Sequence, residues 1–253
     1  MTDLSAFGLV GKRIAITGAN TGIGQGIAVA VARAGGAVVG IGRSAMDETA
    51  RLVAAQRAEF VSVKADISDT KAAVAMLNDL MADGPLDGLV NNAGIIRRAD
   101  SVDFTEEDWD DVMDVNLKSL FFLSQAFGRN CLAAKRGGRI VNLASLLSFQ
   151  GGIRVPSYTA SKHGVLGITR LLANEWAAKG INVNAIAPGY IETNNTEALR
   201  SDPDRSKSIL ERIPAGRWGV ADDIGDAAVF LLARASNYMH GAVIPVDGGW
   251  LAR

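Results

Sequence analysis

Short apolar runs alternate with longer mixed segments through most of the chain. Runs of this length, rich in Val, Ile and Leu, are typical of strands buried on both faces, and the segments between them have the length of amphipathic helices. Since strands and helices alternate, right-handed crossovers predict an α/β fold: a doubly wound, mostly parallel sheet of seven strands with helices on both faces. The predicted strands are residues 13–17, 37–41, 60–64, 87–90, 139–143, 181–186 and 242–246.

Helical patterns fill most of the space between these strands. The predicted helices are one ending near residue 34, residues 47–57, 69–81 and 106–132, one ending near residue 178, and residues 221–233. Residues 190–215 interrupt the alternation of strands and helices, because they are polar and charged. We expect them to form a partly helical insertion between the last two strands. Neither a linker nor a repeat interrupts the chain. We therefore expect a single domain over residues 1–253, with this insertion beside the substrate.

Composition narrows the class of protein. Of the 253 residues, 48% are hydrophobic and 21% are charged, which is ordinary for a globular protein with a large core. The formal net charge of −1 argues against nucleic acid or a membrane surface as a partner. No apolar run approaches about 18 residues, and residues 1–11 lack the pattern of a signal peptide. Cys131 is the only cysteine, which suits a reducing compartment, so we expect a cytoplasmic protein.

A glycine-rich turn follows the first predicted strand. Residues 18–24 read GANTGIG and lead into an Ala- and Val-rich helix. Strand, glycine turn and helix form the context of a dinucleotide site, because glycines let the backbone approach a pyrophosphate at the helix N-terminus. The spacing differs from the commoner Gly-x-Gly-x-x-Gly, and a glycine turn without a ligand is the alternative. We expect a cofactor here.

The end of the second strand bears on the choice between NAD and NADP. A carboxylate at this place holds the adenosine ribose hydroxyls in NAD-binding folds. Here Gly42 occupies the place and Arg43 follows. A guanidinium can pair with the 2′-phosphate of NADP, or it can be a solvated surface group. The residues leave both interpretations of Arg43 open.

Tyr158 and Lys162 are the chief candidates for chemistry. They lie four residues apart in a predicted helix, so their side chains share one face. A phenol with a pKa near 10 is a poor base at neutral pH, and lowering that value by about three units takes roughly 4 kcal/mol. We expect Lys162 to be the main source of the lowering, so that Tyr158 exchanges a proton with an alcohol or carbonyl while a hydride moves. The alternative is an amphipathic helix with a surface Tyr and Lys.

The order of these motifs along the chain resembles the short-chain dehydrogenase/reductase family. The resemblance spans nearly the whole chain, and it implies a Rossmann-type domain, an NAD(P) cofactor and usually a homotetramer. The matching residues are Thr17-Gly18-x3-Gly22-x-Gly24, Asn91-Asn92-Ala93-Gly94, Asn116, Ser145, Tyr158-x3-Lys162 and Pro188-Gly189.

The resemblance also implies a role for each matching side chain. Tyr158 is the general acid/base, Lys162 binds the nicotinamide ribose and lowers the pKa of Tyr158, and Ser145 hydrogen-bonds the substrate oxygen. Asn116 holds a water molecule in a proton relay. Taken singly, Ser145 can be a turn cap and Asn116 a polar residue inside a helix. Besides Tyr158 and Lys162, the cofactor contacts are Gly18, Asn20, Thr21, Gly22, Ile23, Gly24, Arg43, Asp66, Ile67, Asn92, Ala93, Gly94, Pro188, Gly189, Ile191 and Thr193.

A narrower resemblance, to family members that act on keto-deoxy sugar acids, suggests the substrate. A sugar acid needs a cation for its carboxylate and polar groups for its hydroxyls, whereas a fatty-acyl or steroid substrate needs an apolar cleft. We expect Arg97, Arg154 and Asn194, with Arg98 nearby, to border the substrate; surface or intersubunit positions are the alternative. Because these members are mostly NAD-linked, NAD(H) is slightly favoured and NADP(H) is the alternative.

Two other functions are compatible with the sequence. A 3-oxoacyl-thioester (acyl carrier protein) reductase would use the same scaffold and present a basic patch to its carrier. A non-catalytic dinucleotide-binding sensor or scaffold would be favoured by loss of a catalytic side chain, and none is lost. His163 and His240 lack the spacing of metal ligands, so no metal site is predicted.

Overall fold

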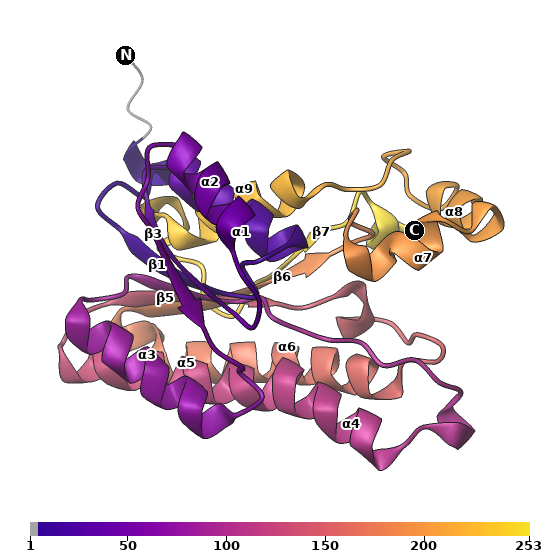
Figure 1. Ribbon diagram of the computed structural model, residues 1–253, viewed down its shortest axis with the longest axis horizontal. Coiled ribbons are helices and arrows are strands. Elements are labelled where there is room, and N and C mark those ends of the chain that lie inside the picture. The colour runs from indigo at the N-terminus through magenta and orange to yellow at the C-terminus, as the bar shows by residue number, and fades with distance from the viewer. Residues whose placement is uncertain (1–4) are drawn as a thin grey trace.

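The computed structural model, which describes residues 5–253, is built around a seven-stranded sheet (Figure 1). The strands lie in the order β3-β2-β1-β4-β5-β6-β7, and all of their pairings are parallel. The doubly wound α/β architecture predicted from the sequence is confirmed, and the sheet proves to be parallel throughout. The strands are β1 (Arg13–Thr17), β2 (Ala37–Gly42), β3 (Phe60–Lys64), β4 (Gly88–Asn91), β5 (Gly138–Leu143), β6 (Ile181–Pro188) and β7 (Val243–Val246).

Helices cover both faces of this sheet (Figure 1). One face carries α1 (Gly22–Arg33), α2 (Asp47–Ala55) and α9 (Ala221–Leu232). The other carries α3 (Thr70–Asp83), α4 (Glu106–Met113), α5 (Ser119–Ala133) and α6 (Pro156–Trp176). The short helices α7 (Glu197–Arg200) and α8 (Pro203–Leu210) follow β6, so residues 190–215 are partly helical, as expected. No helix within residues 5–253 is both long and apolar enough to cross a membrane.

The predicted helix over residues 106–132 is interrupted in the structure. It consists of α4 and α5 with a π-helical turn, Asp114–Lys118, between them. Single π turns inside helices place one extra residue in the spiral and are frequent at functional sites. Asn116 lies within this turn.

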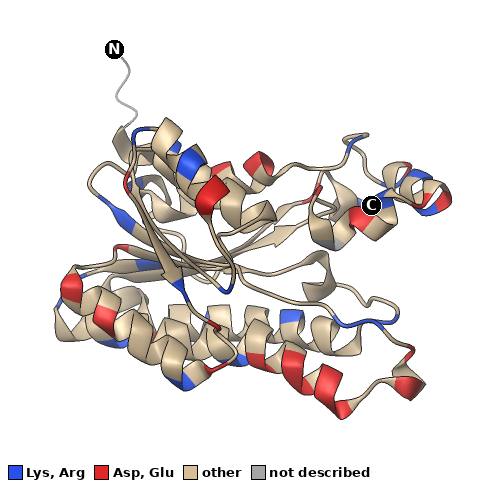
Figure 2. Cartoon of the chain, in the orientation of Figure 1, with Lys and Arg blue, Asp and Glu red and all other residues tan. Residues whose placement is uncertain are grey.

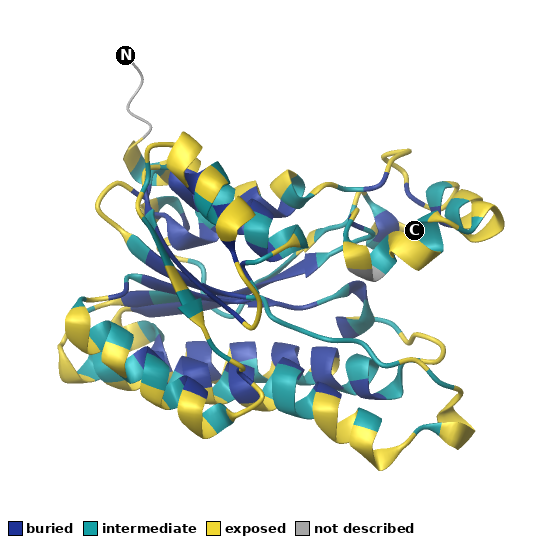
Figure 3. Cartoon of the chain, viewed as in Figure 1, coloured by how far each residue is buried: buried dark blue, intermediate teal, exposed yellow. Residues whose placement is uncertain are grey.

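An apolar core layer packs on each face of the sheet, and successive side chains of β1 point into one layer and then the other. Ile14 and Ile16 pack with Ile27 of α1, whereas Ala15 faces the opposite layer with Leu89 and Phe127 of α5. Figure 3 shows the buried residues gathered on the sheet and on the helix surfaces that face it. Each fully buried large apolar side chain contributes roughly 1.5–3 kcal/mol. The sheet is therefore a firm platform for the loops at its edge.

The carboxyl ends of the parallel strands share one edge of the sheet. The strand order reverses between β1 and β4, and the loops after these two strands leave on opposite faces. Doubly wound sheets bind ligands in the crevice at such a switch point. A separate apolar cluster lies beyond this edge and joins α8, residues after it and Trp250.

Candidate active site

A cavity of about 1060 Å³ opens at the carboxyl edge of the sheet. Loops after six of the strands form its walls, together with residues of α7 and α8. Every residue that the sequence predicted for cofactor contact lines the cavity, and so do Ser145, Arg154 and Asn194. Side chains that are far apart in the sequence therefore meet in one place.

The glycine turn after β1 forms the part of the cavity suited to a pyrophosphate. Gly18 and Gly22 have φ angles of +68° and +56°, which favour glycine. A Cβ atom on Gly24 would lie 2.1 Å from the carbonyl oxygen of Gly18, so only glycine fits there. Thr21 precedes α1 and makes no capping hydrogen bond through its side chain, which leaves the first N–H groups of the helix to an anion. The turn fits a dinucleotide.

Asn92 and Thr17 lock this turn to the end of β4. The Asn92 amide nitrogen Nδ2 donates to the carbonyl oxygen of Thr17 at 2.9 Å and to that of Gly18 at 3.2 Å. The Thr17 hydroxyl accepts hydrogen bonds from the backbone N–H groups of Asn92 and Ala93, each at 3.0 Å. The two loops at the switch point are thus joined by side-chain hydrogen bonds.

The adenosine end of the cavity carries Arg43 and Ser44. Arg43 Nη1 lies 3.9 Å from Asp66 Oδ2, and both side chains are exposed. Ser44 was missed by the sequence analysis; its hydroxyl accepts a hydrogen bond from Asn20 Nδ2 at 2.8 Å, and it lines the cavity next to Arg43. A Cβ atom on Gly42 would come within 3.3 Å of Asn20 Oδ1, which leaves little room for an acidic side chain.

Tyr158 and Lys162 lie on α6, one turn apart, as predicted. Lys162 is buried, and its ammonium donates to the carbonyl oxygen of Leu143 at 2.6 Å. The Lys162 nitrogen Nζ is 5.5 Å from the centre of the Tyr158 ring. The end of β5 therefore holds the lysine at the floor of the cavity.

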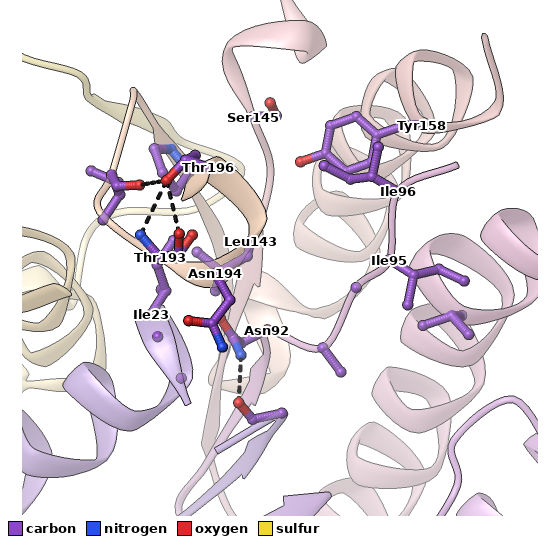
Figure 4. A pocket seen from close by; sticks show the side chains of 18 of the residues that line it. Ile23, Asn92, Ile95, Ile96, Leu143, Ser145, Tyr158, Thr193, Asn194 and Thr196 are labelled. Carbon is purple, nitrogen blue, oxygen red and sulfur yellow. Dashed lines mark hydrogen bonds between the residues drawn. The ribbon is translucent and has the colours of Figure 1, made fainter. Parts of the chain in front are cut away.

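Ser145 faces Tyr158 across the cavity. It follows β5 and caps a short 3₁₀ helix, accepting a hydrogen bond from the Leu147 N–H at 3.2 Å. Figure 4 shows the Tyr158 oxygen pointing toward the side where Ser145 lies, with Thr193 and Asn194 on the facing wall. Two hydroxyl groups thus converge on one region of the cavity, as the reduction of a carbonyl requires.

Burial shifts the pKa values of both candidate catalytic groups. It raises the pKa of Tyr158, although a hydrogen bond with Ser145 and the positive charge of Arg98 oppose the rise. It lowers the pKa of Lys162 to about 8. That Lys162 lowers the pKa of Tyr158 stays a prediction: its ammonium lies 5.5 Å from the centre of the Tyr158 ring and donates to the Leu143 carbonyl.

Asn116 is buried behind the cavity rather than in its lining. Its oxygen Oδ1 accepts from the Ile95 N–H at 2.8 Å, and its Nδ2 donates to the Ile95 carbonyl at 3.0 Å and to Ser161 Oγ at 3.3 Å. The side chain therefore fixes the loop after β4 to α6. Its role in holding a water molecule stays a prediction.

The structure separates the arginines proposed for the substrate. Arg154 lines the cavity, with a φ angle of +63° and an ion pair to Asp100 at 3.1 Å. Arg97 does not line it; its guanidinium pairs with Asp108 at 3.0 Å and with Asp111 at 2.9 Å, on the acidic helix α4 (Figure 2). The interpretation of Arg97 as a substrate residue is therefore corrected.

Arg98, rather than its neighbour Arg97, is the arginine of this loop that borders the cavity. It lines the cavity, and its charge reaches Tyr158. Tyr190 and Arg205 also line the cavity and were not predicted as site residues. Tyr190 directly follows the Pro188-Gly189 motif, so its position was the available signal, whereas Arg205 has no motif of its own. Within the part of the chain that the structure describes, no three His, Cys, Asp or Glu residues gather as metal ligands.

Comparison with known families gives a match over nearly the whole chain. A family model described as enoyl-(acyl carrier protein) reductase matches residues 18–251. The 2-dehydro-3-deoxy-D-gluconate 5-dehydrogenase of Dickeya dadantii is 57% identical over 251 residues, covering 99% of each chain. The Escherichia coli protein of the same name is 56% identical over 251 residues, also with 99% of each chain covered.

Solved structures agree with these sequence relatives. A crystal structure from Agrobacterium tumefaciens with bound NADP has a TM-score of 0.95 and 63% identity, over 98% of this chain and 99% of that one. A gluconate 5-dehydrogenase from Burkholderia cenocepacia, in complex with NADP and tartrate, has a TM-score of 0.94 and 36% identity, with both chains fully covered.

Proposed function

We propose a reaction from the premise that this chain belongs to the short-chain dehydrogenase/reductase family. It is an oxidoreductase that transfers a hydride between a nicotinamide dinucleotide and the secondary alcohol or ketone of a keto-deoxy sugar acid, as in a 2-dehydro-3-deoxy-D-gluconate 5-dehydrogenase. The observation that carries this proposal is the convergence of the Tyr158 and Ser145 hydroxyls beside the glycine turn.

The proton chemistry follows from the positions of these side chains. When bound, a nicotinamide supplies or accepts the hydride. In the direction of reduction, Ser145 donates a hydrogen bond to the substrate carbonyl oxygen, and Tyr158 gives that oxygen its proton. A phenol with an ordinary pKa near 10 is protonated at neutral pH, so Tyr158 has the proton that this donation needs. Lys162, held by the Leu143 carbonyl, orients the cofactor ribose beside Tyr158.

A sugar acid suits the charge of the cavity wall. Arg98, Arg154 and Arg205 line it, and a guanidinium binds a carboxylate by paired, charge-assisted hydrogen bonds. Tyr190 and Asn194 offer polar groups to the sugar hydroxyls. The close relatives named for 2-dehydro-3-deoxy-D-gluconate support the same substrate class. A 3-oxoacyl thioester carries no carboxylate that could bind these guanidinium groups.

The cofactor is a nicotinamide dinucleotide, and we propose that the site accepts NADP(H). The slight preference for NAD(H) expected from the sequence finds no support, since related structures contain NADP. Arg43 and Ser44 border the place where a 2′-phosphate would lie, and no acidic side chain stands at Gly42. Asp66, 3.9 Å from Arg43, leaves the guanidinium partly neutralised.

We also propose a homotetramer in the cytoplasm, as the family resemblance implied. Large apolar side chains remain exposed on the outer layer of helices: Trp109 of α4 at 40%, Phe122 of α5 at 37% and Leu171 of α6 at 48%. Exposed apolar groups on neighbouring helices are typical of interfaces between subunits.

One assay tests the proposed reaction. The purified protein is given NADH or NADPH with 2-dehydro-3-deoxy sugar acids, the neutral amides of the same acids, and 3-oxoacyl thioesters. We expect turnover of the acids, at least about tenfold higher kcat/KM for acids than for amides, and no turnover of thioesters. Turnover of thioesters alone would replace the proposal with acyl reduction. Cofactor binding without any turnover would favour the sensor or scaffold.

A further inference from the structure

An aromatic cluster supports the wall of the cavity from behind. The Tyr190 ring lines the cavity and lies 4.7 Å from the Trp250 ring and 5.5 Å from the Trp218 ring, measured between centroids. Both tryptophans are almost fully buried, at 5% and 7% exposure. The position of Tyr190 is thus set by Trp250, which lies sixty positions further along the sequence.

Trp250 is also clamped to the segment that follows α8. The guanidinium carbon of Arg212 lies 4.0 Å from the centre of the Trp250 ring, a cation–π contact. Arg253 Nη2 donates to the carbonyl oxygen of Glu211 at 2.6 Å. Residues 250–253 therefore contact the end of α8 at two points. Arg205 of the same helix lines the cavity, so these contacts bear on the substrate wall.

The turn that presents Trp250 is itself well fixed. Asp247 accepts hydrogen bonds from the N–H groups of Gly249 and Leu251, each at 2.9 Å. The Ala215 N–H donates to the Gly248 carbonyl at 2.9 Å, which joins this turn to the segment after α8. Trp250 is consequently a rigid support rather than a mobile cover.

The hydroxyl of Tyr190 is suited to meet a sugar hydroxyl. Among the side chains and backbone groups that the structure describes, this hydroxyl has no hydrogen-bond partner. Burial raises the pKa of Tyr190, and the charges of Arg212 and Arg205 oppose the rise only in part. The group is neutral near pH 7, and can both donate and accept a hydrogen bond.

We propose that Trp250, clamped by Arg212, is a positioning residue for the substrate. It holds Tyr190 and α8 so that the Tyr190 hydroxyl and the Arg205 guanidinium meet the hydroxyls and the carboxylate of a sugar acid. This inference rests on the proposed function and adds a specificity device outside the catalytic residues. Most of the predicted cofactor contacts, among them the glycine turn and Arg43, lie on other loops, whereas Pro188, Gly189, Ile191 and Thr193 share the loop of Tyr190.

A pair of substitutions separates the ring from the rest of the side chain. The indole N–H of Trp250 is buried with no acceptor within the described residues, so the ring alone carries the contact. Trp250→Leu removes the aromatic face, and we expect an approximately 5- to 30-fold rise in KM for the sugar acid, with the NADPH dissociation constant unchanged. Trp250→Phe keeps an aromatic face and should stay within about threefold of wild type. Tyr238→Leu, at an aromatic residue that is 99% exposed, is the control.

Arg212, the other member of the cation–π contact, allows a second and independent pair of substitutions. Arg212 is exposed, so Arg212→Gln should fold normally and raise KM, whereas Arg212→Lys keeps the charge and should restore much of the loss. If Trp250 and Arg212 act as one unit, the double variant Trp250→Leu/Arg212→Gln is no worse than Trp250→Leu alone. Additive losses would overturn the clamp.

Hydrogen exchange tests the support without any substrate. Trp250→Leu should speed amide exchange in residues 197–215, and Trp250→Phe should not. If the wild-type protein turns over no sugar acid, the proposed function fails, while this exchange measurement still decides the inference. Unchanged exchange in Trp250→Leu, or a KM equal to that of the Tyr238→Leu control, would overturn it.

Discussion

Burial shifts the pKa values of the two candidate catalytic side chains, Tyr158 and Lys162, toward the neutral form of each. The pKa of Lys162 falls to about 8, and that of Tyr158 rises. At neutral pH the lysine still carries a proton, and the phenol is held as a proton donor. A fixed cation below a protonated phenol is an arrangement that suits reduction of a carbonyl. Tyr158 and Lys162 therefore carry the most direct tests of the mechanism.

Tyr158→Phe removes only the hydroxyl that titrates. We expect kcat to fall about 10²- to 10⁴-fold, the range for a general acid/base, because Ser145 donates only a hydrogen bond to the substrate oxygen and Tyr158 is the group that gives it a proton. The dissociation constant of NADPH, measured by fluorescence titration, should stay within about twofold. A normal kcat would remove Tyr158 from the mechanism.

Lys162 predicts a pH dependence of stability. A lysine whose pKa is lowered on folding, from 10.5 to about 8, binds its proton more weakly in the folded state. Its contribution therefore opposes folding below about pH 8 and fades as the pH rises toward 10.5. Relative to wild type, Lys162→Met should gain roughly 3 kcal/mol more at pH 7 than at pH 10.5 in urea unfolding.

A matched substitution controls for this comparison. Lys179 is exposed, so Lys179→Met should change the free energy of unfolding by a similar amount at both pH values. The same gain for Lys162→Met at both pH values would show that the ammonium is solvated in the folded protein.

Arg43 decides the affinity for the cofactor phosphate in our proposal. Arg43→Ala should raise the dissociation constant of NADP about 10- to 100-fold, the effect of losing a charge-assisted hydrogen bond, and that of NAD less than threefold. Isothermal titration with both cofactors measures the difference. Arg129→Ala, an exposed arginine of α5, should change neither value. Equal losses for NAD and NADP would mean that Arg43 does not meet the phosphate.

Among the elements, the π turn between α4 and α5 carries the least predictable part of the site. The apolar spacing of residues 106–132 predicts one continuous helix. Within the turn at residues 114–118, the Asn116 amide bonds both backbone groups of Ile95, on another loop. A contact over that distance leaves no mark in the local sequence pattern.

The glycine turn predicts a steric effect at the start of α1. Gly24→Ala would place a Cβ atom 2.1 Å from the Gly18 oxygen, so the turn must open. We expect a loss of NADPH affinity of at least about tenfold and a lower melting temperature. Gly167→Ala is the matched control, because its Cβ meets nothing within 4 Å on α6. It should stabilise the protein by about 0.5–1 kcal/mol. Unchanged affinity in Gly24→Ala would place the pyrophosphate elsewhere.

At the scale of the whole molecule, the exposed apolar groups of the outer helix layer predict association. Phe122→Glu or Leu171→Glu should shift the mass measured by light scattering from four chains to fewer, since a buried unpaired charge disfavours the interface. Val10 is 83% exposed and precedes β1, away from these helices, so Val10→Glu should leave the mass unchanged. A single-chain mass for the wild type would contradict the tetramer.

Local patterns in the sequence determined the framework of this protein. The seven apolar runs became the seven strands, because buried parallel strands need continuous apolar residues. Tyr158 and Lys162 share one helix face because four residues complete about one turn. The glycine turn was readable because a positive φ angle and close backbone contact exclude side chains. Each of these features depends on residues within one short segment.

Only the tertiary structure decided which neighbouring side chains reach the cavity. Arg97 and Arg98 adjoin in one loop, yet Arg97 pairs with α4 and Arg98 lines the cavity. The Lys162 ammonium could not be assigned to the Leu143 carbonyl before β5 and α6 were packed together. Tyr190 depends on Trp250, far along the chain. Such contacts arise from packing between distant segments, which local sequence patterns do not encode.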